Sequence, residues 1–162
     1  MDWLGARENV KLALNAGRSV NLIVKGEPDR KGLVLQLRED LGSLAVVDLA
    51  SGATASRQSL VTEIFRELGR PSEARKPPND LTDLHRCIME APTVIQLAFR
   101  HFDQVKTRRY TEDFYSALKH LVEERKLVLM IESRVPFSSL LPPTNSLSRI
   151  QMKTVELNGR IV

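Results

Sequence analysis

Residues 19–33 read SVNLIVKGEPDRKGL, an almost wholly apolar segment that passes into a charged, glycine-containing stretch and then back to leucine. The apolar part, residues 19–24, is short and bounded, which is typical of a strand buried on both faces of a parallel sheet. Leu33, Leu37 and Leu41 then recur at four-residue spacing, which predicts a helix. Strand, loop and helix in this order are the start of an α/β unit.

The same alternation continues to the end of the chain. Together with residues 19–24, apolar segments predict strands at 43–49, 93–99, 127–131 and 152–157, and periodic segments predict helices at 7–16, 33–41, 60–68 and 81–88 and from 111 to about 126. Thr111 is expected to cap the last helix, with Glu112 and Asp113 in its first turn and Arg125 and Lys126 in its last. Strands that alternate with helices predict a three-layer α/β domain with a mainly parallel five-stranded sheet.

Length and composition limit the classes of protein that this sequence can encode. The 162 residues suit a single domain, and the charged, proline-rich loop at 69–80 is too short to separate two. The single cysteine, Cys87, excludes an internal disulfide and is expected to pack in its helix. His85, His101 and His120 are scattered, and no two have metal-ligand spacing, so no metal site is expected.

No apolar run approaches the roughly 20 residues that span a bilayer, and the N-terminus lacks the layout of a secretion signal. We therefore expect a cytoplasmic protein without a membrane partner. The net charge is +4, and the clearest basic cluster contains Lys106, Arg108 and Arg109. This cluster is a candidate nucleic-acid patch, although a solvated loop explains it at least as well.

The order of these pieces resembles the start of an AAA or STAND-type P-loop ATPase domain. Residues 5–8, GARE, match the family's opening Gly-Arg-Glu-like box, and the loop at 26–33 has the place of the Walker A motif. Residues 99–105, FRHFDQV, match the Walker B strand, and Ser133-Arg134 ends the strand that resembles sensor 1. The resemblance covers residues 3–157 and implies the strand order 5-1-4-3-2, which the sequence alone does not establish.

The Walker A position departs from the family pattern in the residues that carry its chemistry. The resemblance calls for Gly-Lys-Ser/Thr at the end of the loop, where the lysine reaches the β- and γ-phosphates and the hydroxyl binds magnesium. Lys31 stands one residue early, Gly32 takes the lysine position and Leu33 replaces the hydroxyl. Glu27 and Asp29 add negative charge where phosphates should lie.

Two interpretations of this loop remain open. It can be an ordinary charged turn between a strand and a helix, with Gly26 and Gly32 providing backbone freedom. Alternatively, it retains binding of some anion through Arg30, Lys31 and free backbone amides.

The Walker B position has also lost its acids. The family places two acidic residues there, one for the magnesium shell and one to polarise the attacking water. Arg100 and His101 occupy those positions, and Asp103 lies outside them. Arg134 at the sensor-1 position touches a phosphate in an active relative, but is equally compatible with a surface role. We therefore expect no magnesium-dependent hydrolysis and no catalytic residues.

The functional hypothesis is a catalytically inactive P-loop ATPase-like module that acts through a protein partner. The resemblance associates such modules with signalling, scaffolding or regulation, often in prokaryotic defence. The sequence ends soon after the fifth predicted strand without a helical lid, which favours a static adaptor unless this sequence is a fragment of a longer protein. Two alternatives remain: a module that binds ATP or ADP without hydrolysis, and a nucleic-acid-associated fragment related to initiator or transposition ATPases. The oligomeric state, the partner and the presence of a bound nucleotide stay open, and no cofactor is expected.

Overall fold

In this computed structural model of the protein, residues 2–25, 30–69 and 81–157 are described, with the backbone alone described for residues 30–33. These residues form a five-stranded, all-parallel sheet in the order β2-β3-β4-β1-β5. The strands are β1 (Val20–Val24), β2 (Leu44–Asp48), β3 (Ile95–Arg100), β4 (Leu127–Ser133) and β5 (Lys153–Leu157). The predicted fold class is confirmed, and from the opposite edge the order is the 5-1-4-3-2 implied by the resemblance.

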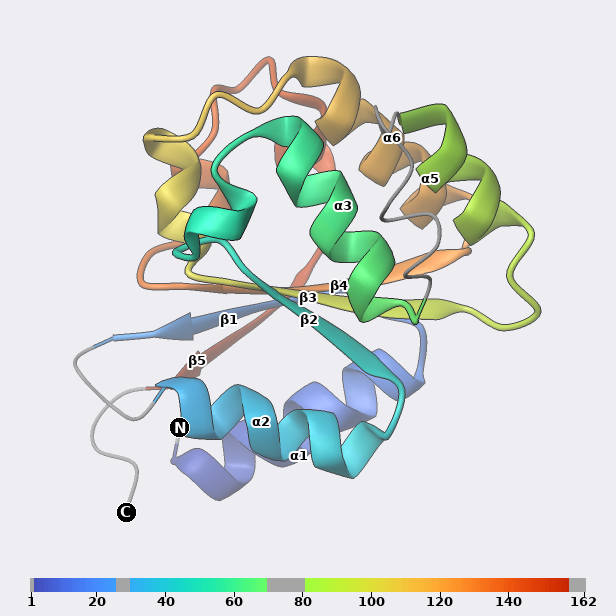
Figure 1. The fold of residues 1–162 in the computed structure, drawn as a ribbon. Coiled ribbons are helices and arrows are strands. Elements are labelled where there is room, and N and C mark those ends of the chain that lie inside the picture. Colours follow the sequence, from blue (N-terminus) through green and yellow to red (C-terminus); the bar gives the residue numbers. More distant parts are fainter. Residues whose placement is uncertain (1, 26–29, 70–80, 158–162) are drawn as a thin grey trace.

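Helices cover both faces of the sheet, so the domain has three layers (Figure 1). The α-helices are α1 (Trp3–Asn15), α2 (Arg30–Leu41), α3 (Arg57–Glu67), α5 (Leu81–Met89) and α6 (Glu112–Glu123). Helices α1 and α2 pack on one face and α3, α5 and α6 on the other (Figure 1). Alternate residues of each strand enter one of two apolar cores, which explains why the strand segments read as continuous apolar runs.

Short 3-10 helices connect several of these elements. They are η1 (Gly52–Thr54), η2 (Phe102–Lys106), η3 (Phe137–Ser139) and η4 (Ser146–Arg149). Helix η2 follows β3 after one residue and η3 follows β4 after three residues, so both begin at the carboxyl edge of the sheet. In open α/β sheets this edge is where ligands bind.

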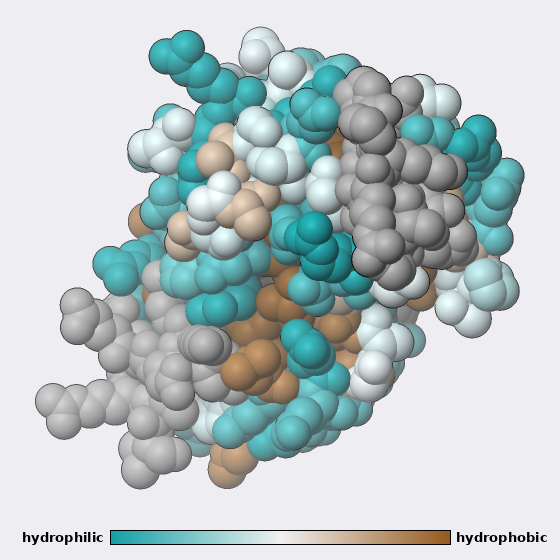
Figure 2. Space-filling model, viewed as in Figure 1, coloured by the Kyte–Doolittle hydropathy of each residue, from teal (hydrophilic) through white to brown (hydrophobic). Residues whose placement is uncertain are grey.

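Strand β2 forms one edge of the sheet. Hydrophilic residues cover much of the face in Figure 2, and a hydrophobic area lies in the middle of the view. Val46 on β2 and Leu41 at the end of α2 are half-buried and pack against the core beneath α1 and α2.

The first helix begins earlier than the predicted 7–16. Asp2 precedes α1, and its carboxylate accepts the backbone N–H of Gly5 at 2.7 Å. This N-cap adds a turn that apolar periodicity does not reveal, because the cap acts through a hydrogen bond. The predicted start at Arg7 is therefore wrong by four residues.

The end of the long helix is also corrected. Helix α6 ends at Glu123, and Arg125 has a left-handed backbone with φ 58°, so Arg125 and Lys126 lie beyond the last turn. Thr111 occupies the predicted N-cap position, but its hydroxyl donates to the Asp113 carboxylate and makes no capping bond to the backbone. Glu112 and Asp113 do lie in the first turn.

The other predicted strands and helices are found within two or three residues of their expected bounds. The proline-rich loop at 69–80 lies, apart from Gly69, outside the described residues. In the described parts of the chain, no helix is long and apolar enough to cross a membrane.

Candidate functional site

The carboxyl ends of β2 and β3 carry a cluster of charged side chains. Asp48 and Arg100 are register partners at the last positions of the two strands. The Arg100 guanidinium lies 3.4 Å from Asp48 Oδ2, and Nδ1 of His101 lies 2.7 Å from Asp48 Oδ1. The resemblance places Arg100 and His101 at the Walker B position, and both side chains are engaged with a carboxylate of the neighbouring strand.

A second carboxylate reaches the turn after β3 from β4, the strand on the other side of β3 from β2. Glu132 on β4 is fully buried, and its Oε2 accepts the backbone N–H of His101 at 2.8 Å. His101 has φ 54°, a left-handed conformation that costs a non-glycine residue about 1 kcal/mol. The contacts with Asp48 and Glu132 hold the residue in this conformation at the turn into η2.

The hydrogen bonds of Asp48 determine its ionisation. Burial raises the pKa of Asp48, but hydrogen bonds from His101 and from the Ala50 N–H outweigh burial, and the pKa is lowered. Because the ionised carboxylate can only accept, the ring N–H of His101 is on Nδ1, facing Asp48. The bond from the Ala50 N–H makes Asp48 part of the turn after β2, and the link to His101 is additional.

Arg100 is the least satisfied member of the cluster. Its side chain is 11% exposed, and its Nε is buried without a hydrogen-bond partner in the described part of the protein. The contact of its Nη1 with Asp48 is long for a charged pair. Arg100 therefore keeps a buried N–H group unused beside Asp48 at the carboxyl end of β3.

The residues at the sensor-1 position are held in two different ways. Ser133 is fully buried; its hydroxyl accepts from Asn21 Nδ2 at 2.9 Å and donates to the Val135 carbonyl at 2.7 Å. Arg134 is exposed, and its backbone N–H donates to both carboxylate oxygens of Asp103 at 3.1 and 3.3 Å. The Ser133 hydroxyl is thus committed within the protein, while Asp103 fixes the start of the next loop.

Asn21 on β1 organises this part of the edge. Its carboxamide is 1% exposed, donates to the Ile131 carbonyl as well as to Ser133, and accepts the Phe137 N–H at 3.0 Å. These bonds join β1, β4 and η3 around one buried side chain. In the sequence, Asn21 is visible only as an isolated polar residue within an apolar strand, which does not reveal its partners.

The side chains at the Walker A position lie outside the described part of the structure. Gly26 lies outside the described residues, and Arg30, Lys31 and Gly32 fall in the first turn of α2, where the backbone alone is described. The two interpretations of this loop remain predictions. Within the described ranges, no group of three or more histidine, cysteine or acidic side chains is arranged to hold a metal ion.

The basic cluster is divided in the structure. Lys106 and Arg109 are exposed, whereas Arg108 is half-buried and its Nη2 donates to the carbonyls of Leu49 and Ser51 at 3.0 and 3.3 Å. Arg108 therefore ties the loop after β2 to the loop after η2. Two of the three residues remain available for an external phosphate.

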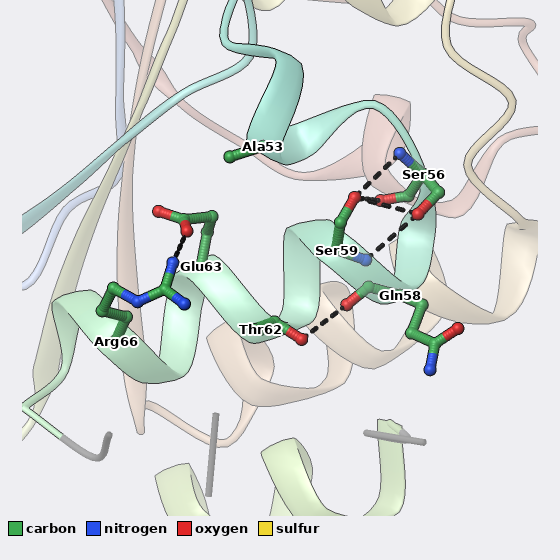
Figure 3. A pocket seen from close by; sticks show the side chains of 7 residues that line it. All are labelled: Ala53, Ser56, Gln58, Ser59, Thr62, Glu63 and Arg66. Carbon is green, nitrogen blue, oxygen red and sulfur yellow. Dashed lines mark hydrogen bonds and ion pairs between the residues drawn. The ribbon is translucent and has the colours of Figure 1, made fainter. Parts of the chain in front are cut away.

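A surface groove of about 400 Å³ lies along α3 and reaches Ala53 of η1 (Figure 3). Its polar side chains mainly bond to one another or to their own helix. Ser56 and Ser59 form a capping box, Thr62 donates to the Gln58 carbonyl, and Arg66 pairs with Glu63. Because these groups are already satisfied, the groove lacks the convergent free polar groups of a ligand site.

Comparison with known proteins supports the fold. No family model and no curated protein matches the sequence. Among solved structures, the Aeropyrum pernix ORC2 protein in its ADPNP–ADP complexes matches with a TM-score of 0.67 and 17% identity, over 94% of this chain and 46% of that one. A Walker-type ATPase of Pyrococcus abyssi matches with a TM-score of 0.64 and 10% identity, over 94% and 52%.

A Drosophila assembly gives a similar match. A chain in the structure of ORC bound to AT-rich DNA and Cdc6 matches with a TM-score of 0.64 and 10% identity, over 98% of this chain and 55% of that one. The protein thus spans about half the length of these three chains. The structural similarity supports a shared P-loop ATPase-like fold with a five-stranded parallel sheet. At identities this low it supports nothing finer.

Proposed function

We propose that this protein is a P-loop ATPase-like module that does not hydrolyse nucleotide and acts by contact with a protein partner. One observation carries the proposal: the end of β3, where the fold holds the metal-binding acids, presents Arg100 and His101 paired with Asp48. A divalent cation at this point would meet a guanidinium and an imidazole that already neutralise the nearest carboxylate.

The neighbouring contacts support the same proposal. Glu132, the buried carboxylate closest along the edge, accepts the backbone N–H of His101. The Ser133 hydroxyl, which would have to face a phosphate, is directed to Asn21 and Val135. Internal hydrogen bonds therefore join three strand ends, and these polar groups are already committed within the protein.

Protein contact is the function proposed for such an edge. A module whose strand ends are joined internally has little to gain from a phosphate, and its rigid carboxyl edge can present loops to another protein. The solved structures with this fold include a chain from a complex that contains ORC, Cdc6 and DNA. That composition motivates a search for a protein partner, with signalling or regulation as the proposed setting.

Purification of the tagged protein from its own cells, followed by quantitative mass spectrometry, tests the proposed partner. We expect at least one protein at a molar ratio near one, retained after washing at high salt. A parallel purification of an Asp48→Ala, Glu132→Gln double variant measures how far recovery depends on the ordered edge. Failure to recover any near-stoichiometric partner with the wild-type protein would overturn the proposed adaptor role.

Nucleotide-linked stability separates this proposal from a module that binds nucleotide without hydrolysis. A ligand present at about 100 times its dissociation constant adds roughly 2.7 kcal/mol to stability. We expect no shift of the melting temperature with millimolar ATP or ADP, with or without magnesium. A saturable shift with either nucleotide would favour the binding module instead.

A further inference from the structure

Two histidines that are distant in the sequence meet on the face opposite α1 and α2. His85 lies on α5 and His120 on α6, and their ring centres are 5.1 Å apart with an angle of 23° between the planes. The three histidines are scattered in the sequence, and the structure brings two of them together. Helix packing, rather than sequence spacing, brings the two rings together.

The two backbones are held in place by the core. Helices α5 and α6 lie side by side (Figure 1). Leu84 and Ile88 of α5 and Leu118 and Leu121 of α6 are all buried in one apolar cluster. Only the side chains of the histidines can move appreciably, so the entropic cost of bringing two ligands together is largely met by folding.

The ring separation suits a shared metal ion. A zinc ion binds an imidazole nitrogen at about 2.0–2.1 Å, which puts each ring centre about 3 Å from the ion. At a near-tetrahedral angle the two ring centres then lie about 5 Å apart. The observed separation of 5.1 Å is close to this value, but the two rings are stacked, so each ring must turn out of the stack to direct a nitrogen at the ion. The terminal torsion of histidine has a broad minimum, and His120 is exposed, so this turn has a small energetic cost.

We propose that His85 and His120 bind one divalent transition-metal ion of the zinc class and thereby clamp α5 to α6. No third histidine, cysteine or acidic ligand completes the group in the described ranges, so water fills the remaining positions. Imidazole selects zinc, nickel or copper over magnesium, which prefers oxygen ligands.

Thermal unfolding of the intact protein with added zinc chloride tests the site. Zinc that binds only the folded state raises the melting temperature in a saturable way. We expect this rise in wild type and expect magnesium chloride to produce none. Calorimetric titration should give one zinc ion per chain. Replacement of either ligand in His85→Gln or His120→Gln should raise the zinc concentration at half-effect by about tenfold or more, because one of two protein ligands is lost.

The controls distinguish a ligand role from a packing role. A lower melting temperature of His85→Gln in the absence of zinc reports the loss of ring packing alone. The relevant measurement is therefore the rise in melting temperature that zinc produces in each variant. Ser116→Ala, one turn before His120, should keep the wild-type increment. The site would be overturned if millimolar zinc failed to raise the melting temperature of the wild-type protein. It would also be overturned if the His85→Gln, His120→Gln double variant kept the full rise, or if the rise were lost only in His101→Gln.

Discussion

Nδ1 of His101 lies 2.7 Å from Oδ1 of Asp48, and this contact ties the end of β3 to the end of β2. The two residues are 53 positions apart and become neighbours because their strands pair in parallel. On the other side, the backbone N–H of His101 is bound by Glu132 of β4. One residue thus joins the carboxyl ends of β2, β3 and β4.

Replacing Asp48 should measurably destabilise the protein at neutral pH. Asp48→Asn removes a charged acceptor shared by His101, Arg100 and the Ala50 N–H, and a charge-assisted hydrogen bond at a partly exposed site contributes about 1–2 kcal/mol. Urea unfolding provides the measurement. Asp83→Asn is the matched control, since the Asp83–Arg86 pair is exposed and such pairs contribute less than about 1 kcal/mol. Equal effects of the two substitutions would contradict a special role for Asp48.

The same carboxylate should contribute to acid sensitivity. The pKa of Asp48 is lowered in the folded protein from an unfolded value of 3.8, so the folded state binds this proton more weakly. The stabilising contribution is therefore present above the unfolded value and is lost as the pH falls through the lower folded value. Between pH 6 and 2, the free energy of unfolding should fall more steeply in wild type than in Asp48→Asn. Parallel pH profiles would show that Asp48 does not carry this dependence.

Arg108 and Arg109 should behave differently despite being adjacent. Arg108→Ala removes the hydrogen bonds to the carbonyls of Leu49 and Ser51 and should destabilise the protein by about 1–2 kcal/mol. Arg109 is exposed, and Arg109→Ala should change stability by less than about 0.5 kcal/mol. Chemical denaturation of both variants checks this difference. A larger loss in Arg109→Ala would contradict the structural role of Arg108.

Asn21 should be among the more sensitive polar positions. Asn21→Ala leaves the Phe137 N–H and the Ile131 carbonyl without their side-chain partner in a buried region, and unsatisfied buried groups cost about 1–3 kcal/mol each. We expect a loss of about 2–4 kcal/mol in the free energy of unfolding. Asn15→Ala, at the exposed end of α1, serves as the control and should lose less than about 0.5 kcal/mol.

The sequence predicted the strands well. Strands β1 and β4 in particular are short, largely apolar segments that are buried along their whole length. Helix ends were less predictable. The Asp2 cap and the left-handed Arg125 depend on single hydrogen bonds and backbone angles that leave little trace in periodicity. The positions of Arg100 and His101 at the end of β3 were also found from the sequence.

The partners of those residues could not be found in the same way. Strand order decides which carboxylates flank the end of β3, and the sequence alone does not determine that order. Once β2 and β4 are placed on either side of β3, Asp48 and Glu132 become neighbours of His101. The pairing of His85 with His120 likewise depends on how α5 packs against α6.

The central claim is that the cluster at the end of β3 does not support metal-dependent hydrolysis. Its most direct test is phosphate release by the purified protein with millimolar ATP and magnesium, in parallel with Lys31→Ala. The account predicts release no faster than the protein-free blank, with no difference between wild type and variant. Magnesium-dependent, multiple-turnover release by wild type that Lys31→Ala abolishes would contradict it.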